Sequence, residues 1–329
     1  MRKTLAKKSI NIKDKEDLLY QKLKQSRFYQ QRLPAWRPVP TICAIVIFYS
    51  IFSVIFLIIG IFLLEYSNKI KEIEIKYNEY CKKQNNNNCK IEHEIKEDIP
   101  RPIFIYYKIY GFFQNHRRYM KSRSLKQLMG ETISLSEIKS SEDCAPLYTN
   151  EDMGFKEDQL SLDGKTFLVK DKLAIPCGIM AKTFFNDNFS EWKINDIDII
   201  INEKNIAWDK DKELFKNTNI SEQWIDVEDE HFIVWMRPAG LPDVKKLWGR
   251  IEKNDLKKGD KLTIRVESKY AVDNFNGDKS IILGNSNIFG GNNTFLGICF
   301  IVVGIISLFI GIGFVINYCI TNKRKEKEK

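Results

Sequence analysis

The chain has 329 residues, 29% of them charged, and a formal net charge of +9. That length suits two soluble domains, but residues 41–64 and 295–320 are uncharged apolar runs. Each exceeds the roughly 20 residues that a helix needs to cross a bilayer, which excludes a wholly soluble protein.

The two ends of the chain are basic. Residues 1–37 contain 11 lysines and arginines against three acidic residues, and residues 322–329 contain five against two. The ends therefore carry +11 and the rest of the chain −2. Because Lys/Arg-rich flanks remain in the cytoplasm, both termini are predicted to be cytoplasmic: an arm at 1–40 and a tail at 321–329.

Transmembrane helices are predicted at 41–65 and 295–320. The first begins too late and is too long to be a cleaved signal peptide. In the second, Gly297, Gly304 and Gly311 recur every seven residues and lie along one side of the helix. Such small residues allow close helix packing, either against the first span or against a helix of a partner.

Residues 66–294 are then lumenal or extracellular, where disulfides form. Four cysteines fall here, Cys81, Cys89, Cys144 and Cys177, and they allow three pairings. Pairing each with its neighbour in the sequence is the simplest. No Cys-x-x-Cys pair occurs and the three histidines are scattered, so no metal site is predicted.

The stretch FFQNHRRYMKSRS at 112–124 interleaves basic and aromatic residues. This pattern is typical of nucleic-acid binding, but the predicted topology places it away from the cytoplasm, so no nucleic-acid partner is expected. A catalytic His116 has no support, because the chain lacks a phosphate loop, a nucleophile elbow and a zinc-protease helix. We expect no enzymatic activity and no cofactor.

The second half of this region has strand patterns. WKINDIDIII alternates before an apolar run, and HFIVWM is β-branched and aromatic. KLTIRVESKYAV places Leu262, Ile264 and Val266 on one face, and SIILG follows. The fold class predicted is therefore a membrane protein in which two transmembrane helices flank a large antiparallel, sandwich-like α+β domain with a few short helices.

Six ordered segments resemble one family, the ligand-effect-modulator and cell-division-control-protein-50 proteins. They are FYQQRLPAW (28–36), FFQNHRRYMKSRSLKQLMG (112–130), IPCGIMAKTFFND (175–187), IAWDKDKELFKN (206–217), WMRPAGLPDVKKLWGRI (235–251) and GGNNTFLG (290–297). Family members are the non-catalytic β-subunits of phospholipid flippases, the type IV P-type ATPases.

The resemblance implies a function. The chain is expected to bind the catalytic subunit of such an ATPase as a heterodimer, to help it leave the endoplasmic reticulum, and to support movement of phospholipids to the cytoplasmic leaflet. Expected locations are the endoplasmic reticulum, Golgi or endosomal membranes and the plasma membrane. The family context also allows a partner that is a flippase fused to a guanylyl cyclase, as in an apicomplexan parasite.

The resemblance also implies roles for individual residues. Gln30, Arg32, Leu33 and Trp36 are expected to contact the ATPase, although Trp36 also suits an interfacial anchor. Arg117, Arg118 and Arg123 either anchor buried hydrogen bonds inside the domain or face acidic loops of the ATPase or lipid headgroups. Arg237 presents the same choice, with a solvated surface as a further alternative. The resemblance favours the pairing of Cys144 with Cys177.

The glycosylation signals depart from the family. Family members usually carry an acceptor at the position of Asn186, but Asn186-Asp187-Asn188 is not one. Instead Asn188 and Asn219 each begin an Asn-x-Ser signal and are the candidates here.

The alternative function is a subunit of a two-span, ligand-gated ion channel, which shares this topology. Such a channel is expected to contain more cysteines and a polar pore-lining face, whereas the apolar runs 41–64 and 295–320 hold no Asp, Glu, Lys, Arg or His. A homotrimer favours the channel, and a 1:1 complex with a large ATPase favours the flippase subunit.

Overall fold

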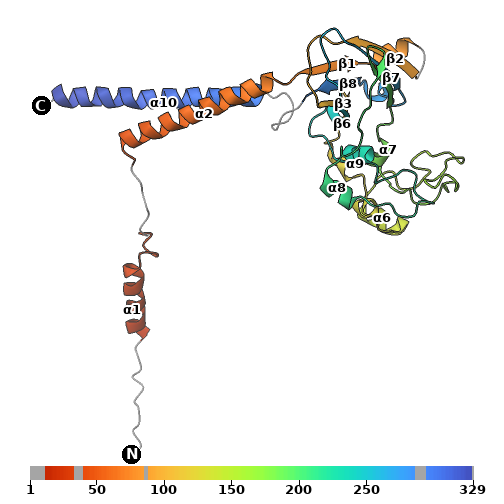
Figure 1. Ribbon diagram of the computed structural model, residues 1–329. Helices are drawn as coiled ribbons and strands as arrows, with labels where there is room; N and C mark the ends of the chain where they lie inside the picture. The colour runs from red at the N-terminus through yellow and green to blue at the C-terminus, as the bar shows by residue number, and fades with distance from the viewer. Residues whose placement is uncertain (1–11, 33–39, 85–87, 286–293, 328–329) are drawn as a thin grey trace, which may run out of the picture. The chain divides into compact units, whose positions relative to one another are not determined.

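The structure is a computed structural model, and it describes residues 12–32, 40–84, 88–285 and 294–327. Contacts divide the chain into two units, Met1–Ile58 with Phe300–Lys329, and Ile59–Cys299. The first unit holds α1 (Ile12–Gln25) and most of two long helices, α2 (Ile42–Asn68) and α10 (Thr294–Lys327). The second holds a β-rich domain and the remaining ends of those two helices (Figure 1).

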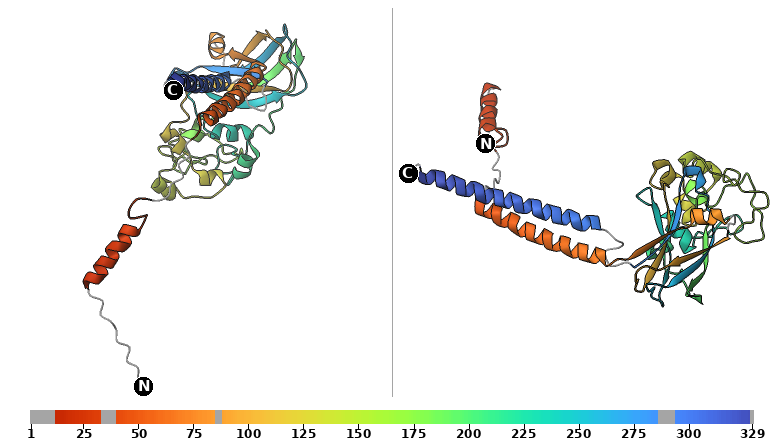
Figure 2. Two further views of the ribbon diagram at one scale, coloured as in Figure 1. Left: turned by 90° about the vertical axis from the view of Figure 1, so that its left-hand side faces the viewer. Right: turned by 90° about the horizontal axis from the view of Figure 1, so that it is seen from above.

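The long helices α2 and α10 run side by side (Figures 1 and 2). Both are long and apolar enough to cross a membrane, and only 6% and 17% of their most apolar segments are buried. A core helix of a soluble protein is instead buried all round. The outward-facing apolar side chains therefore suit lipid, and the two predicted spans are confirmed as helices of this kind.

Two four-stranded antiparallel sheets form the domain between the spans. The first has the order β1-β8-β3-β6, with β1 Glu72–Lys76, β8 Lys279–Gly284, β3 Ile103–Ile109 and β6 Val244–Ile251. The second has the order β2-β7-β4-β5, with β2 Asn88–Glu94, β7 Lys261–Glu267, β4 Asn188–Ile194 and β5 Ile197–Asp198. The predicted β-rich, antiparallel fold between two spans is confirmed.

Side chains that alternate along the strands build the core. On β7, Leu262, Ile264 and Val266 are buried, as the period of two predicts. The two sheets meet through rings such as Phe189 on β4 and Trp248 on β6, whose centroids lie 4.9 Å apart. The sheets therefore pack face to face around one apolar core.

The remaining elements are short helices. They are α3 (Asn78–Lys83), α4 (Arg117–Lys121), α5 (Leu125–Leu128), α6 (Leu135–Ser141), α7 (Ile179–Lys182), α8 (Asp209–Leu214), α9 (Glu230–Met236) and the 3₁₀ turn η1 (Asp273–Phe275). In Figure 1, α6, α7, α8 and α9 lie together below the sheets. They form a helical layer in which the candidate site residues 112–124 lie.

The strand prediction for HFIVWM is wrong, because this segment forms α9. Asp229 caps the helix by accepting a hydrogen bond from the backbone N–H of His231 at 3.2 Å. Phe232, Trp235 and Met236 are buried at helical spacing. A short apolar run does not distinguish a buried strand from a buried helix, and the capping aspartate was the available signal.

Candidate partner-binding surfaces

Aromatic side chains of 112–124 hold this stretch to the core. The ring of Phe112 packs against Tyr119, Trp235 and Phe275, with centroids 5.5, 5.9 and 5.4 Å away. The Tyr119 hydroxyl lies 2.8 Å from Thr183 Oγ1. The rings of Phe112 and Tyr119 are therefore packed inside the domain, whereas Phe113 is 59% exposed.

The three arginines of this stretch do not share one environment. Arg123 is half-buried and donates to the Met236 carbonyl at 3.0 Å, and burial lowers its pKa. Arg117 and Arg118 are exposed on α4, and neither guanidinium has a hydrogen bond or ion pair with the described residues. The expectation that these arginines anchor buried hydrogen bonds inside the domain is therefore wrong for Arg117 and Arg118. It holds for Arg123 in part, because the partner is a carbonyl and not a carboxylate.

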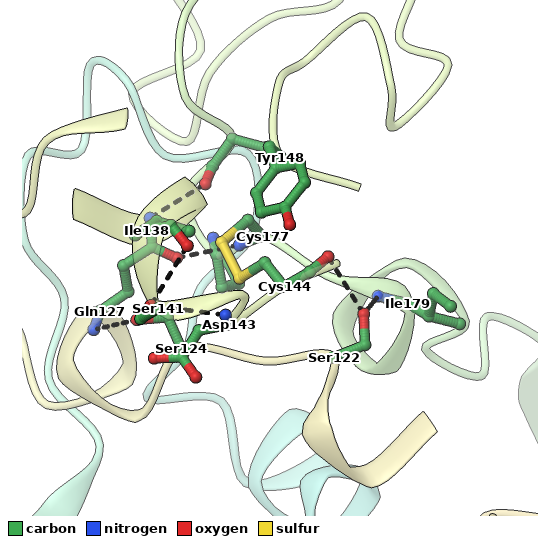
Figure 3. The surroundings of a disulfide bond; sticks show 12 residues. Ser122, Ser124, Gln127, Ile138, Ser141, Asp143, Cys144, Tyr148, Cys177 and Ile179 are labelled. Atoms are coloured by element: carbon green, nitrogen blue, oxygen red, sulfur yellow. Dashed lines mark hydrogen bonds between the residues drawn. A yellow bond between two sulfur atoms is a disulfide. The ribbon is translucent and has the colours of Figure 1, made fainter. Parts of the chain in front are cut away.

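A disulfide joins Cys144 to Cys177, with Cα atoms 5.5 Å apart, and a second joins Cys81 to Cys89. The neighbouring pairing is confirmed. Around the first bridge, the Ser122 hydroxyl donates to the Cys144 carbonyl at 3.1 Å and accepts from the Ile179 N–H at 2.8 Å (Figure 3). One buried serine thus fastens both sides of the bridge to the stretch 112–124.

Gln127 makes the next connection. Its side-chain oxygen accepts from the Cys177 N–H at 3.0 Å, and its amide donates to the Ala174 carbonyl at 3.1 Å. Gly178 has a φ of +99°, and a Cβ atom there would lie 2.2 Å from the Ser122 carbonyl oxygen. Only glycine fits this position, which explains the Cys-Gly pair in the sequence.

A groove of about 740 Å³ opens beside this bridge. Its lining comes from three segments: residues 118–126, residues 141–146 and Ile179 at the start of α7. The lining includes Arg118 but also Lys121, which was not among the predicted partner-binding residues. We call this the bridge groove.

Arg237 lies on a second surface. Its guanidinium donates to one carboxylate oxygen of Asp211 through Nε at 3.0 Å and through Nη2 at 2.8 Å. It also lies over the ring of Trp208, 5.3 Å from the centroid, and this ring is 68% exposed. An exposed tryptophan beside an arginine is typical of an interface centre. The sequence analysis missed Trp208, although the signal was present in the family segment IAWDKDKELFKN.

Two lysines of the domain are buried. Lys279 bonds Asp187 at 2.7 Å, with side-chain exposures of 1% and 0%, and Asp187 also accepts from the Tyr77 hydroxyl at 2.7 Å. Lys246 donates to the Arg237 carbonyl, and burial lowers its pKa to about 8, with a further decrease from the Arg237 guanidinium. Neither lysine is accessible enough to contact a partner directly.

The glycine row of α10 faces the other long helix. A Cβ atom on Gly297 would lie 2.8 Å from Leu64, and one on Gly304 would lie 2.9 Å from Leu57. The Ser53 hydroxyl donates to the Gly304 carbonyl at 2.8 Å. Packing against the first span is therefore observed. Binding of a partner helix along Gly297, Gly304 and Gly311 stays a prediction.

The predicted N-terminal contact is described only in part. Gln30 and Arg32 are exposed, and the Gln30 amide donates to the Leu23 carbonyl at 3.3 Å. Leu33 and Trp36 lie outside the described residues.

Both glycosylation candidates lie at the surface. Asn188 is exposed at the start of β4. Asn219 is exposed, and its side-chain oxygen accepts a bond of 2.7 Å from the Ser221 hydroxyl of its own signal. Their modification stays a prediction.

The site offers binding groups more than reactive ones. Within residues 12–32, 40–84, 88–285 and 294–327, no three His, Cys, Asp or Glu side chains are grouped as metal ligands. His116 is exposed at the start of α4, where its side chain does not cap the helix. What the domain presents outward is exposed arginines, an exposed tryptophan and a charged groove.

Comparison with known proteins agrees with this picture. The family model described as LEM3 (ligand-effect modulator 3) family / CDC50 family matches residues 63–325. ALA-interacting subunit 3 of Arabidopsis thaliana is 32% identical over 92% of this chain and 87% of its own length. Cell cycle control protein 50A of Bos taurus is 34% identical over 87% of this chain and 86% of its own.

A yeast relative has a more explicit name. Phospholipid-transporting ATPase accessory subunit CRF1 of Saccharomyces cerevisiae is 27% identical over 88% of this chain and 83% of its own length. The comparisons give no support to the ion-channel alternative.

Proposed function

Because the chain belongs to the LEM3 (ligand-effect modulator 3) / CDC50 family, we propose that it is the non-catalytic accessory subunit of a phospholipid-transporting type IV P-type ATPase. The observation that carries the proposal is the family match over 63–325, which spans the β-rich domain, the end of α2 and most of α10. The accessory-subunit name of the yeast relative supports it.

The proposal includes a topology. Both termini are cytoplasmic and the β-rich domain lies on the lumenal or extracellular side. The basic residues of the two ends support this orientation, as do two disulfides that require an oxidising compartment. Glycans on Asn188 and Asn219 belong to the same topology, since both side chains are exposed.

The work of the subunit is assembly and delivery. It forms a heterodimer with the ATPase, accompanies it out of the endoplasmic reticulum to Golgi, endosomal and plasma membranes, and supports phospholipid movement toward the cytoplasmic leaflet. ATP hydrolysis belongs to the partner, which the family context allows to be a flippase–guanylyl cyclase fusion. Gln30, Arg32, Leu33 and Trp36 contact the ATPase from the cytoplasmic arm, and Arg117, Arg118 and Arg237 from the domain.

Depletion in the native cell tests this proposal. We expect the ATPase to accumulate in the endoplasmic reticulum and uptake of a fluorescent phospholipid to fall, because the catalytic subunit is neither exported nor completed. Re-expression of the chain should restore both. Normal ATPase location and normal lipid uptake after full depletion would contradict the proposed function.

A further inference from the structure

A smaller groove, of about 130 Å³, opens between residues 166–173 and residues 221–222. Asn150 lies in its lining, and we call it the Asn150 groove. Its parts are joined by two contacts. Lys172 pairs with Glu222 at 2.7 Å, and the Asn150 N–H donates to the Lys172 carbonyl at 3.0 Å. The groove is therefore held in shape before anything binds in it.

The lining of the Asn150 groove carries no net charge. Its charged residues are Lys172 and Glu222, which neutralise each other, and its other polar side chains are neutral hydroxyls and one amide. Among the described residues of the lining, an anion finds no unpaired cation, and a metal ion finds no group of three ligands. The groove therefore suits an uncharged molecule.

Two apolar side chains of the lining are open to water. Phe167 is 57% exposed and Val169 is 54% exposed. Covering such side chains is favourable because apolar surface is removed from water. A sugar ring has a C–H face that can cover an aromatic ring and O–H groups at its edge, so it matches a lining that is partly apolar and partly polar.

One buried side chain of the lining is an acceptor without a donor. Asn150 is 2% exposed, and its side-chain amide donates to the Val169 carbonyl at 2.8 Å. Its side-chain oxygen has no hydrogen-bond partner in the described part of the chain. Buried polar atoms are almost always paired, because an unpaired one keeps the full cost of leaving water. An O–H group supplies the missing donor, directly or through one water.

The glycosylation candidate Asn219 stands beside this groove. Its side-chain oxygen accepts from the hydroxyl of Ser221, a lining residue, at 2.7 Å. The nitrogen that would carry a glycan belongs to the same amide group. The Asp163 N–H also donates to the Ile220 carbonyl at 3.2 Å, so the chain next to Asn219 is attached to the segment that leads to Phe167. A sugar on Asn219 therefore starts at the groove, and its short tether gives it a high effective concentration there.

We propose that the first sugar of a glycan on Asn219 lies in the Asn150 groove. Its C–H face covers Phe167, and one of its O–H groups donates to the Asn150 side-chain oxygen, directly or through one water. The sugar thereby fastens residues 166–173 to the turn at 219–223. This inference rests on the proposed topology, in which Asn219 is lumenal or extracellular.

A double-mutant cycle provides the first test. In the purified full chain with a glycosylated Asn219, Phe167→Ala should lower the melting temperature by about 2–4 °C. In the Asn219→Gln variant the same change should have no measurable effect, because no sugar covers the ring. Phe113→Ala is the matched control, because Phe113 is 59% exposed and lies outside the groove, and its effect should not depend on Asn219. An equal effect of Phe167→Ala in both backgrounds would overturn the inference.

Hydrogen exchange provides a local second test. Asn219→Gln should speed exchange of the backbone amides in residues 166–173 several-fold, because the sugar no longer holds this segment. Asn188→Gln removes the other candidate signal and should leave these amides unchanged. Wild-type exchange rates in the Asn219 variant would contradict a sugar that lies in the groove.

Mass spectrometry of the protein from its native cell separates this inference from the proposals on which it rests. A glycan on Asn188 and none on Asn219 would overturn the inference and leave the proposed topology standing. The proposed function fails separately, if depletion leaves the location of the ATPase and lipid uptake normal.

Discussion

At the scale of single residues, the two buried lysines differ in what surrounds them. Lys279 faces the carboxylate of Asp187, the Ser268 hydroxyl at 2.9 Å and the Tyr270 carbonyl at 2.7 Å. Its pKa is lowered by burial, and Asp187 opposes that decrease. Lys246 has the Arg237 carbonyl as a partner and the guanidinium of the same residue as a repelling charge.

Loss of the Lys279 ammonium should destabilise the domain strongly. Lys279→Met leaves the buried Asp187 carboxylate without its cation, and we expect unfolding to become easier by about 3–5 kcal/mol. Lys170→Met is the control, because it removes an exposed pair with Glu157 of 2.7 Å and should cost under about 1 kcal/mol. Denaturant unfolding of the full chain in detergent measures both. An equally small loss of unfolding free energy in the two variants would show that the fold does not depend on the buried Lys279–Asp187 pair.

Lys246 should make stability depend on alkaline pH. Its pKa is about 8 in the fold against 10.5 for an ordinary lysine, so between these pH values the unfolded chain holds a proton that the folded chain has released. The contribution of Lys246 to the free energy of unfolding therefore rises as the pH increases from about 8 to 10.5.

The matching variant is Lys246→Met. At neutral pH it should be more stable than the wild type, because the ionisation cost is on the order of 3 kcal/mol at about 1.4 kcal/mol per pKa unit. That advantage should shrink as the pH approaches 10. Denaturant unfolding at pH 7 and pH 10 measures it, and an advantage that is constant or grows with pH would contradict the assigned pKa.

The sequence predicted the environment of some side chains and not of others, for physical reasons. The period of two identified the buried face of β7 correctly, because that pattern is local. The different fates of Arg118 and Arg123 were not predictable. They depend on the end of α4 at Lys121 and on the distant Met236 carbonyl that Arg123 reaches.

At the scale of elements, the close approach of α2 and α10 depends on glycine. Gly304→Leu places atoms where Leu57 already lies, and we expect a loss of about 1–3 kcal/mol. Gly313→Leu is the control, because a Cβ atom there meets nothing within 4 Å. Thermal stability in detergent should separate the two. Equal tolerance of both changes would exclude close packing at Gly304.

The Cys144–Cys177 bridge holds together the segments that form the bridge groove. We predict that Cys144→Ser costs about 2–5 kcal/mol and leaves the protein in the endoplasmic reticulum. Cys319→Ser is the control, because Cys319 is a free cysteine in α10. Location by microscopy and non-reducing gels measure the outcome. Normal export of the Cys144 variant would count against a structural role for the bridge.

At the scale of the whole molecule, the sequence predicted the order of parts well. Two uncharged runs and an alternating region between them specify two spans and an antiparallel domain. The strand orders β1-β8-β3-β6 and β2-β7-β4-β5 could not be predicted, because they join strands more than 200 residues apart in sequence, such as β1 and β8. The bridge groove was equally inaccessible, since three separate segments form it.

The most direct measurement of the central claim is the native mass of the chain purified gently from its own membranes, with its companions identified by mass spectrometry. The account predicts one large type IV P-type ATPase at equal stoichiometry with this chain. A homo-oligomer without an ATPase, in material that has left the endoplasmic reticulum, would contradict it.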